Sequence, residues 1–404
     1  MLAAAIVFGL STACQIIAPR LKIPALVLLL PAGFLFGVIA PQFRFDQILG
    51  SAFPVAVDLM VAVILFQGGM ELSAIRLKGK DKTVVRKLIW IGAPITLIAG
   101  AVASHFLLGL EWEIAFALSA FLVVSGPTVV TPILDVVRPN QRVRGLLMWE
   151  GTLLDPIGAL LAVVIFQIIK ATSASSPIEA IELFLFGAVT AVLAAVLGVA
   201  LFIAGGKLVK GNEMLGTQVL LGSVLVAAGL ANTITDDSGL LTALLMGFIA
   251  PRLAKKFGAS MPSARPFFNT IVSIGIGVLF ITIAALVPYS TVISLFWPTL
   301  IVALILMLVV RPLVVAIGTA GTSVSRNDRI FMSWMYPRGI VAAATATSVG
   351  TSLIALKIAG AEKLLPAAFI IIAITVTVYG LSATPLARLL KIRDDSNANQ
   401  AQND

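Results

Sequence analysis

Long apolar runs separated by short polar stretches fill this 404-residue chain. A run of about 20 apolar residues is the length that an α-helix needs to cross the hydrocarbon core of a bilayer. Apolar length and the punctuation between runs predict about thirteen spanning helices. The predicted helices are residues 1–19, 23–40, 51–73, 88–109, 113–135, 145–170, 179–205, 215–234, 238–254, 266–288, 291–318, 328–352 and 366–390. The pattern therefore predicts an all-α polytopic membrane protein.

Composition agrees with this class and excludes several others. The chain is 59% hydrophobic and 12% charged, whereas soluble domains carry about 25% charged residues. The single cysteine, Cys14, and the single histidine, His105, exclude thiolate or imidazole metal clusters. No phosphate-binding Gly-x-x-x-x-Gly-Lys-Ser/Thr loop occurs. We therefore expect neither an enzyme nor a bound cofactor.

The net charge of +9 points to topology once its placement is considered. If the N-terminus faces out, 22 of the 28 lysines and arginines fall on the cytoplasmic side of the predicted helices. Such a bias is what the positive-inside rule expects of membrane proteins. The sequence thus predicts a multi-pass cell (inner) membrane protein with a cytoplasmic C-terminus. Nucleic-acid binding is excluded as the reason for the charge.

Thirteen helices allow an internal symmetry. The first six (residues 1–171) and the last six (residues 211–392) form sets of opposite orientation, joined by a seventh connector helix (residues 172–210). Inverted repeats of this kind are common in secondary transporters. A polar C-terminal tail, residues 393–404, follows the last helix.

Three interruptions fall near mid-membrane depth. The predicted fifth helix contains Ser125-Gly126-Pro127-Thr128, the twelfth contains Tyr336-Pro337-Arg338-Gly339, and the sixth contains Asp155-Pro156. At 1.5 Å per residue each lies roughly 13–18 Å from its helix start, near the centre of a core about 30 Å thick. Proline and glycine weaken a helix, so we expect the fifth and twelfth predicted helices to unwind at these places. Two broken helices in matching positions of a repeat indicate a transport site.

Asp155 is the leading candidate for that site. A charge at this depth costs on the order of 3 kcal/mol and is retained mainly for function. A partly desolvated carboxylate holds its proton to a higher pH, so a proton and a cation can compete for it near neutrality. Thr152, three residues earlier, lies on the same helix face and offers a hydroxyl oxygen. The alternatives are that Asp155 only bonds unwound backbone and that Thr152 is an ordinary small residue at a helix contact.

The other ionisable groups at this depth have separate interpretations. Glu150 and Arg338 are predicted to form a structural ion pair between the sixth and twelfth helices, since either charge alone would be costly. The alternative is that Arg338 balances carbonyl ends of the broken helix. Arg311, before Pro312, is interpreted as a cytoplasmic-side anchor. Gln67 and Glu71 in the third helix are candidates for the cation path.

These residues resemble the monovalent cation:proton antiporter superfamily, in particular its sodium/proton exchanger (CPA1-type) branch, over essentially the whole chain. The resemblance implies that Asp155 is the ion-binding carboxylate and that helices 4–6 and 11–13 form a core. It implies that this core moves like an elevator against a dimerising panel built from the remaining helices. The motifs that carry it are Glu150-Gly151 leading to Asp155, Ser125-Gly126-Pro127, Pro337-Arg338-Gly339, Leu65 to Glu71, and Ser238-Gly239-Leu240.

The chain departs from the family pattern at the site itself. Leu154-Asp155 stands where members commonly carry Asn-Asp or Asp-Asp, and Ser125-Gly126-Pro127 where they carry Thr-Asp-Pro. Gly151 replaces a serine. Coordination is therefore expected from Asp155, backbone carbonyls from Ser125 through Gly126 to Thr128, Thr152 and water.

The predicted function is exchange of a monovalent cation, with Na⁺ first and K⁺ or Li⁺ as alternatives, for H⁺ by alternating access. One carboxylate at the site favours an electroneutral one-for-one cycle. A passive cation channel, a transport-inactive sensor module and a carrier of small organic solutes are the competing hypotheses. The expected partners are the cation, the proton, the lipid bilayer and a second copy of the chain.

Overall fold

The computed structural model consists of helices, and it contains no strand in the part of the chain that it describes. The described residues are 2–21, 23, 25–40, 50, 52–74, 81–172, 177–209, 212–235, 238–257 and 265–392. The helices that form the first half are α1 (Leu2–Leu21), α2 (Leu26–Ile39), α4 (Ala52–Ala74), α5 (Asp81–Leu108), α6 (Trp112–Val123), α7 (Pro127–Val137) and α8 (Gln141–Thr172). The remainder are α9 (Pro177–Leu208), α10 (Glu213–Ile234), α11 (Ser238–Lys256), α12 (Arg265–Leu286), α13 (Tyr289–Ile305), η1 (Leu306–Val310), α14 (Arg311–Gly318), α15 (Arg326–Trp334), α16 (Ile340–Ala355), η2 (Ala361–Lys363) and α17 (Leu364–Leu389).

These elements follow the predicted order of membrane crossings. Within the described residues, seven helical spans are long and apolar enough to cross a membrane. Shorter apolar helices are α2, α6, the central part of α4 and nearly all of α16. The fifth crossing is split into α6 and α7, and the twelfth into α15 and α16. The all-α polytopic prediction and its two discontinuous helices are confirmed. The predicted tail, residues 393–404, lies outside the described residues.

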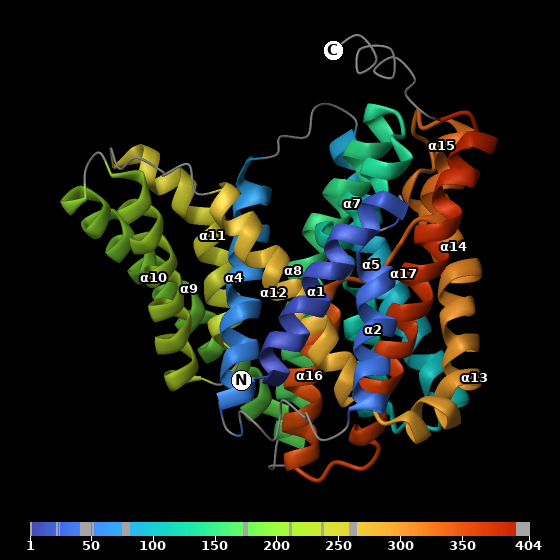
Figure 1. The fold of residues 1–404 in the computed structure, drawn as a ribbon, viewed down its shortest axis with the longest axis horizontal. Helices are drawn as coiled ribbons and strands as arrows, with labels where there is room; N and C mark the ends of the chain where they lie inside the picture. Colours follow the sequence, from blue (N-terminus) through green and yellow to red (C-terminus); the bar gives the residue numbers. More distant parts are fainter. Residues whose placement is uncertain are drawn as a thin grey trace.

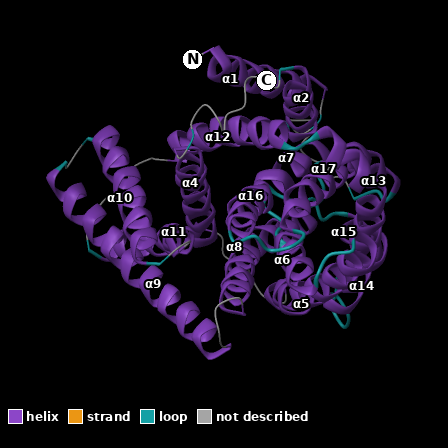
Figure 2. Ribbon diagram, turned by 90° about the horizontal axis from the view of Figure 1, so that it is seen from below, coloured by secondary structure: helices purple, strands orange, loops and turns teal. Residues whose placement is uncertain are grey.

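The helices pack in two neighbouring groups (Figures 1 and 2). In one group α4 lies along α11, α11 packs on α9 and α10, and α12 packs along α1 and α2. In the other group α5 packs against α6, α13 and α14, while α17 contacts α13, α16 and α6. The long helix α8 contacts α5, α6, α7 and α16 of the second group as well as α4, α9 and α11 of the first. Residues in the middle of α8 therefore lie where the two groups meet.

Glycines allow the first group to pack closely. A Cβ atom on Gly33 of α2 would lie 2.6 Å from the Cα of Ile281 on α12, and one on Gly37 would lie 2.7 Å from the Cα of Ala285. Membrane helices gain little from apolar burial against lipid, so close backbone approach through small residues is a main source of their association. The backbones of α2 and α12 therefore lie in close contact.

Several helix ends that carry basic residues meet at one face of the molecule. Arg142, at the start of α8, donates to Asp81 Oδ1 at the start of α5, at 2.8 Å, and to the Ser323 carbonyl before α15. The Asn327 side chain at the start of α15 donates to the carbonyl of Leu390, just after α17, at 2.9 Å. The starts of α5, α8 and α15 and the end of α17 therefore share a face, as the count of crossings requires.

Candidate ion-binding site

Two extended backbone segments interrupt the fifth and twelfth crossings. Val124, which follows α6, has φ −61° and ψ 127°, and Met335, which follows α15, has φ −91° and ψ 105°. A proline disfavours the helical conformation of the residue before it, and Pro127 and Pro337 both lie in or beside these segments. The predicted unwinding at both places is confirmed.

Side-chain hydrogen bonds join the two segments. Ser125 Oγ donates to the carbonyl oxygen of Pro337 at 3.1 Å, and the Tyr336 hydroxyl donates to the carbonyl oxygen of Val123 at 2.7 Å. Carbonyls at a helix end lack an intrahelical partner, and leaving one unsatisfied in the interior is costly. These bonds therefore hold the two broken helices together and satisfy backbone groups that the breaks expose.

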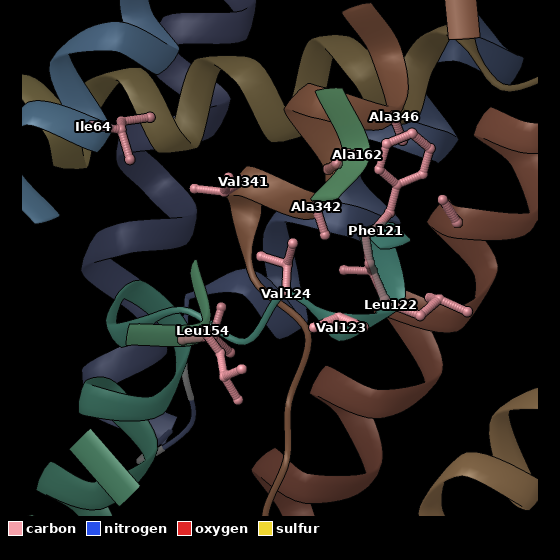
Figure 3. Packing of buried hydrophobic residues seen from close by; sticks show 14 of the residues in the cluster. Ile64, Phe121, Leu122, Val123, Val124, Leu154, Ala162, Val341, Ala342 and Ala346 are labelled. Atoms are coloured by element: carbon pink, nitrogen blue, oxygen red, sulfur yellow. The ribbon is translucent and has the colours of Figure 1, made fainter. Parts of the chain in front are cut away.

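Hydrophobic side chains pack around the point where the two extended segments cross (Figure 3). Phe121, Leu122, Val123 and Val124 come from the end of α6, and Leu154 comes from α8; all five are fully or almost fully buried. Val341, Ala342 and Ala346 at the beginning of α16 pack in the same region. The end of α6, the middle of α8 and the beginning of α16 therefore pack through apolar side chains next to the crossing.

Asp155 lies directly against the crossing. Its side chain is 6% exposed, and a Cβ atom built on Gly126 would lie 2.6 Å from Oδ2 and 2.8 Å from Oδ1 of the carboxylate. The Asp155 carboxylate is therefore in contact with the backbone of the first extended segment. The sequence predicted this neighbourhood from the depth of each interruption.

A cavity of about 350 Å³ opens beside the carboxylate. Its lining comes from α1, α2, α4, α7, α8 and α12, so it lies between the two helix groups. Asp155 is the only titratable side chain among its described lining residues. The polar residues that line it with Asp155 are Gln15, Gln67, Thr131, Asn269 and Ser273.

Polar pairs on the α12 side of this cavity tie α12 to α1 and α4. Gln67 Nε2 donates to Asn269 Oδ1 at 2.7 Å, and Ser273 Oγ donates to Gln15 Oε1 at 2.9 Å. The predicted path residue Gln67 therefore does line the cavity. Sequence reasoning missed Gln15, Asn269 and Ser273. Each is a polar residue within a predicted membrane helix, which makes it a candidate, but whether it faces the cavity follows only from the packing of the helices.

Two other predicted ligands, Thr152 and Ser125, do not line the cavity. Thr152 is buried and its Oγ1 donates to the carbonyl of Met148 at 2.6 Å, while the Ser125 hydroxyl is engaged with Pro337. Neither is among the described residues that line the cavity. The side chains of Thr128 and Glu71 lie outside the part of the chain that the structure describes.

The predicted partner of Glu150 is wrong. Glu150 pairs with Arg311 of α14: Nη1 donates to Oε1 at 2.5 Å and Nη2 donates to Oε2 at 2.9 Å. Arg311 also donates from Nε to the carbonyl of Met332 at 2.9 Å, and it is only 3% exposed, so it is not a surface anchor. The π-helical turn Leu306–Val310 directly precedes Arg311 and changes the rotation of α14 relative to a continuous helix. The sequence predicted one regular helix over residues 291–318, and a regular helix does not reveal that Arg311 faces α8.

Arg338 lies beside this pair without joining it. Its guanidinium carbon lies 4.2 Å from the centroid of the Tyr336 ring, and that of Arg311 lies 4.5 Å from the same centroid. Cations over an aromatic face are attracted by the ring quadrupole. The pair of Glu150 and Arg311 is neutral, so Arg338 leaves one positive charge near the crossing. Asp155 supplies one negative charge on the cavity side.

The arrangement can bind one small cation or one proton. A single desolvated carboxylate faces a polar cavity, and among the described residues no group of histidine, cysteine and acidic side chains could hold a resident metal ion. Binding a proton or a monovalent cation neutralises the carboxylate in either case.

Comparison with known proteins places the chain among cation:proton antiporters. The family described as "Sodium/hydrogen exchanger, transmembrane" matches residues 3–389. Na(+)/H(+) antiporter 1 of Methanocaldococcus jannaschii is 27% identical over 349 residues, which are 84% of this chain and 80% of that protein. K(+)/H(+) antiporter NhaP2 of Shewanella sp. (strain ANA-3) is 25% identical over 96% of this chain, which spans 66% of that longer protein.

A solved structure supports the fold. The sodium proton antiporter MjNhaP1 from Methanocaldococcus jannaschii at pH 8 superposes with a TM-score of 0.76, covering 96% of this chain and 97% of that one at 23% identity. With the family match across nearly the full length, the broken crossings and the cavity carboxylate, the chain belongs to the transmembrane sodium/hydrogen exchanger family.

Proposed function

We propose that this protein exchanges a monovalent cation for a proton across the membrane, with Asp155 binding each in turn. The observation that carries the proposal is that Asp155 is the one titratable side chain among the described residues lining the cavity between the two helix groups. The relatives named Na⁺/H⁺ and K⁺/H⁺ antiporters support it. Na⁺ is the first candidate, followed by K⁺ and Li⁺.

The proposed ligands combine one charged group with weaker oxygen donors. Asp155 supplies the carboxylate, while the backbone of Ser125, Gly126 and Thr128, the Thr152 hydroxyl and water complete the coordination. Gln67 and Glu71 belong to the proposed path. A hard monovalent cation accepts such a set because carbonyl and water oxygens replace its hydration shell.

The proposed cycle is electroneutral. Glu150 and Arg311 neutralise each other in a bidentate pair, so neither is needed to compensate the transported charge. Asp155 then carries either one proton or one cation on each half-cycle, and the charge that crosses is the same in both directions.

The proposed movement is alternating access by two units. The core consists of α5 to α8 and α13 to α17, and the panel consists of α1, α2, α4 and α9 to α12, with dimerisation through the panel. The separation of the contacts into two groups supports this division. We place the basic helix ends in the cytoplasm, because 22 of 28 basic residues belong to them, and the protein in the cell membrane.

The test is exchange in vesicles that contain the purified protein and a pH-sensitive dye. External Na⁺, K⁺ or Li⁺ should alkalinise the interior with the wild type, and Asp155→Asn should abolish the signal. Asp135→Asn is the matched control, because Asp135 is a half-exposed carboxylate on α7 outside the cavity, paired with Arg144. Wild-type vesicles that stay silent with every cation, or an Asp155→Asn protein as active as wild type, would overturn the proposal. A cation current without proton movement would favour the passive channel.

A further inference from the structure

Four glycines surround the Asp155 carboxylate. Gly151 and Gly158 lie four residues before and three residues after Asp155 on α8, which places all three on one helix face. Gly126 and Gly339 are the residues that immediately precede α7 and α16. The four glycines therefore come from the three elements that meet at the site.

Gly126 is in direct contact with the carboxylate. A Cβ atom at this position would lie 2.6 Å and 2.8 Å from the two carboxylate oxygens and 2.9 Å from Cγ of Asp155. Real Cβ atoms do not approach oxygen atoms this closely, so a side chain at position 126 would displace the carboxylate. The backbone φ of Gly126 is −102°, which any residue adopts, so the glycine is required by space and not by backbone strain.

Gly339 brings the second broken helix onto the same point. A Cβ atom at Gly339 would lie 3.0 Å from the nitrogen of Gly126, 3.3 Å from its Cα and 3.7 Å from Oδ1 of Asp155. The two extended segments thus cross where Gly339 contacts Gly126, next to the Asp155 carboxylate. The beginnings of α7 and α16 both reach Asp155 because neither crossing residue has a side chain.

The two glycines of α8 remove the last obstacle to this approach. A Cβ atom on Gly151 would lie 3.2 Å from the carbonyl oxygen of Ser125, and one on Gly158 would lie 2.9 Å from the nitrogen and 3.0 Å from the Cα of Val124. The face of α8 that carries Asp155 therefore rests directly on the extended backbone.

We infer that Gly126, Gly151, Gly158 and Gly339 are positioning residues that seat the Asp155 carboxylate at the N-termini of α7 and α16. The inference rests on the proposed function of Asp155. The first N–H groups of a helix have no intrahelical partner and carry about half a positive charge in sum. Two such helix ends stabilise the charged carboxylate through backbone groups.

Charged and titratable groups also lie near the glycine seat, which is the set Gly126, Gly151, Gly158 and Gly339. Glu150 on α8, Arg311 on α14, and Tyr336 and Arg338 on the second extended segment line a small cavity that does not include Asp155. On the side of the 350 Å³ cavity, the described lining residues from α1, α4 and α12 are polar but not titratable. The positive charge of Arg338 is present with or without the glycines, so a change at a glycine is expected to shift the pH at which the carboxylate gives up its proton.

The first experiment measures the pH dependence of exchange for Gly126→Ala and Gly339→Ala. The methyl group of Gly126→Ala pushes the carboxylate itself, and that of Gly339→Ala pushes the Gly126 backbone on which the carboxylate rests. In both variants the carboxylate moves away from the helix ends, so its charged form loses stabilisation. The pH at half-maximal exchange should rise by about half a unit to one unit. Gly145→Ala is the matched control, because Gly145 also lies on α8 and has nothing within 4 Å of an added Cβ atom. A folded Gly126→Ala protein with the wild-type pH profile would overturn the inference.

The second experiment needs no transport and uses thermal unfolding in detergent. Gly126→Ala should lower the melting temperature by several degrees in the wild-type background, and by less than half as much when Asp155→Ala removes the carboxylate. Equal losses in both backgrounds would contradict the contact between Gly126 and Asp155. If Gly126→Ala does not fold by itself, the folded yield of the double variant Gly126→Ala with Asp155→Ala decides the matter: recovery supports the contact, and a double variant that also fails to fold contradicts it. A wild type that does not exchange ions would refute the proposed function and leave this cycle valid.

Discussion

Arg311 and Glu150 illustrate how a buried charge is made tolerable at the scale of single residues. Each is at most 3% exposed, and the guanidinium binds both carboxylate oxygens while its Nε reaches the Met332 carbonyl. Desolvation of two ions costs several kcal/mol each, and only such complete hydrogen bonding offsets it. The pair connects α8 to α14 and does not line the cavity beside Asp155.

Glu150→Gln should therefore reduce stability more than it changes the chemistry of transport. Removing one partner leaves Arg311 as an uncompensated buried charge, which costs about 3–5 kcal/mol. Folded yield and the melting temperature in detergent should fall strongly. The double variant Glu150→Gln with Arg311→Met should recover most of the loss, because no bare charge remains. Full yield and an unchanged melting temperature for Glu150→Gln, with transport lost, would show instead that Glu150 acts in the transport step.

The same residues show what a sequence can and cannot predict about a site. Asp155 was located because its depth follows from residue counts along one helix. The partner of Glu150 was not, since the choice between Arg311 and Arg338 depends on the rotation of α14 after the π-helical turn Leu306–Val310. The cavity residue Asn269 was missed for a related reason. Which face of α12 meets α4 is decided by packing between helices, and no local pattern records it.

At the scale of helices, the two broken crossings follow from local chemistry. Proline removes a backbone donor and restricts its predecessor, so the breaks at Pro127 and Pro337 were predictable in position. What joins the broken helices was not predictable. The hydrogen bonds from Ser125 to Pro337 and from Tyr336 to Val123 form only when the two extended segments meet. They hold the two interrupted helices together at that point.

Tyr336→Phe tests this crossing. The variant keeps the ring that both guanidiniums cover but removes the hydroxyl that binds the Val123 carbonyl at 2.7 Å. An unsatisfied buried carbonyl costs about 1–3 kcal/mol, so the melting temperature should fall and the transport rate with it. Tyr289→Phe is the control, because Tyr289 is 58% exposed at the start of α13. Equal melting temperatures for the two variants would mean that the hydroxyl does not hold the helices together.

At the scale of the whole molecule, the cavity lies on one side of Asp155. Gln15 and Thr131 belong to the last two turns of α1 and α7, Gln67 lies seven residues before the end of α4, and Asn269 lies four residues after the start of α12. Those four helix ends carry or precede the basic segments of the chain. The cavity is therefore on the side of the basic face. In the orientation proposed above, a transporter in this state receives ions from the cytoplasm.

Accessibility of a cysteine in the cavity tests this state. Ser273 lines the cavity, and its neighbour Ile274, at the same depth on α12, is 38% exposed and is not among the lining residues. Ser273→Cys should react with a membrane-impermeant thiol reagent added to the cytoplasmic side, because water in the cavity allows the thiolate to form. Ile274→Cys should not react, because a thiol that faces hydrocarbon stays protonated. The native Cys14 is buried and contributes little background.

The side dependence of this labelling separates the mechanisms. Alternating access predicts fast labelling of Ser273→Cys from the cytoplasmic side in inside-out vesicles and much slower labelling from the outside in right-side-out vesicles. A cation gradient that drives turnover should slow the cytoplasmic reaction, since the carrier then spends more of its time open to the outside. A continuous pore would let an impermeant reagent small enough to follow the ion react from both sides at similar rates. Equal rates would therefore reject the moving core and favour the channel.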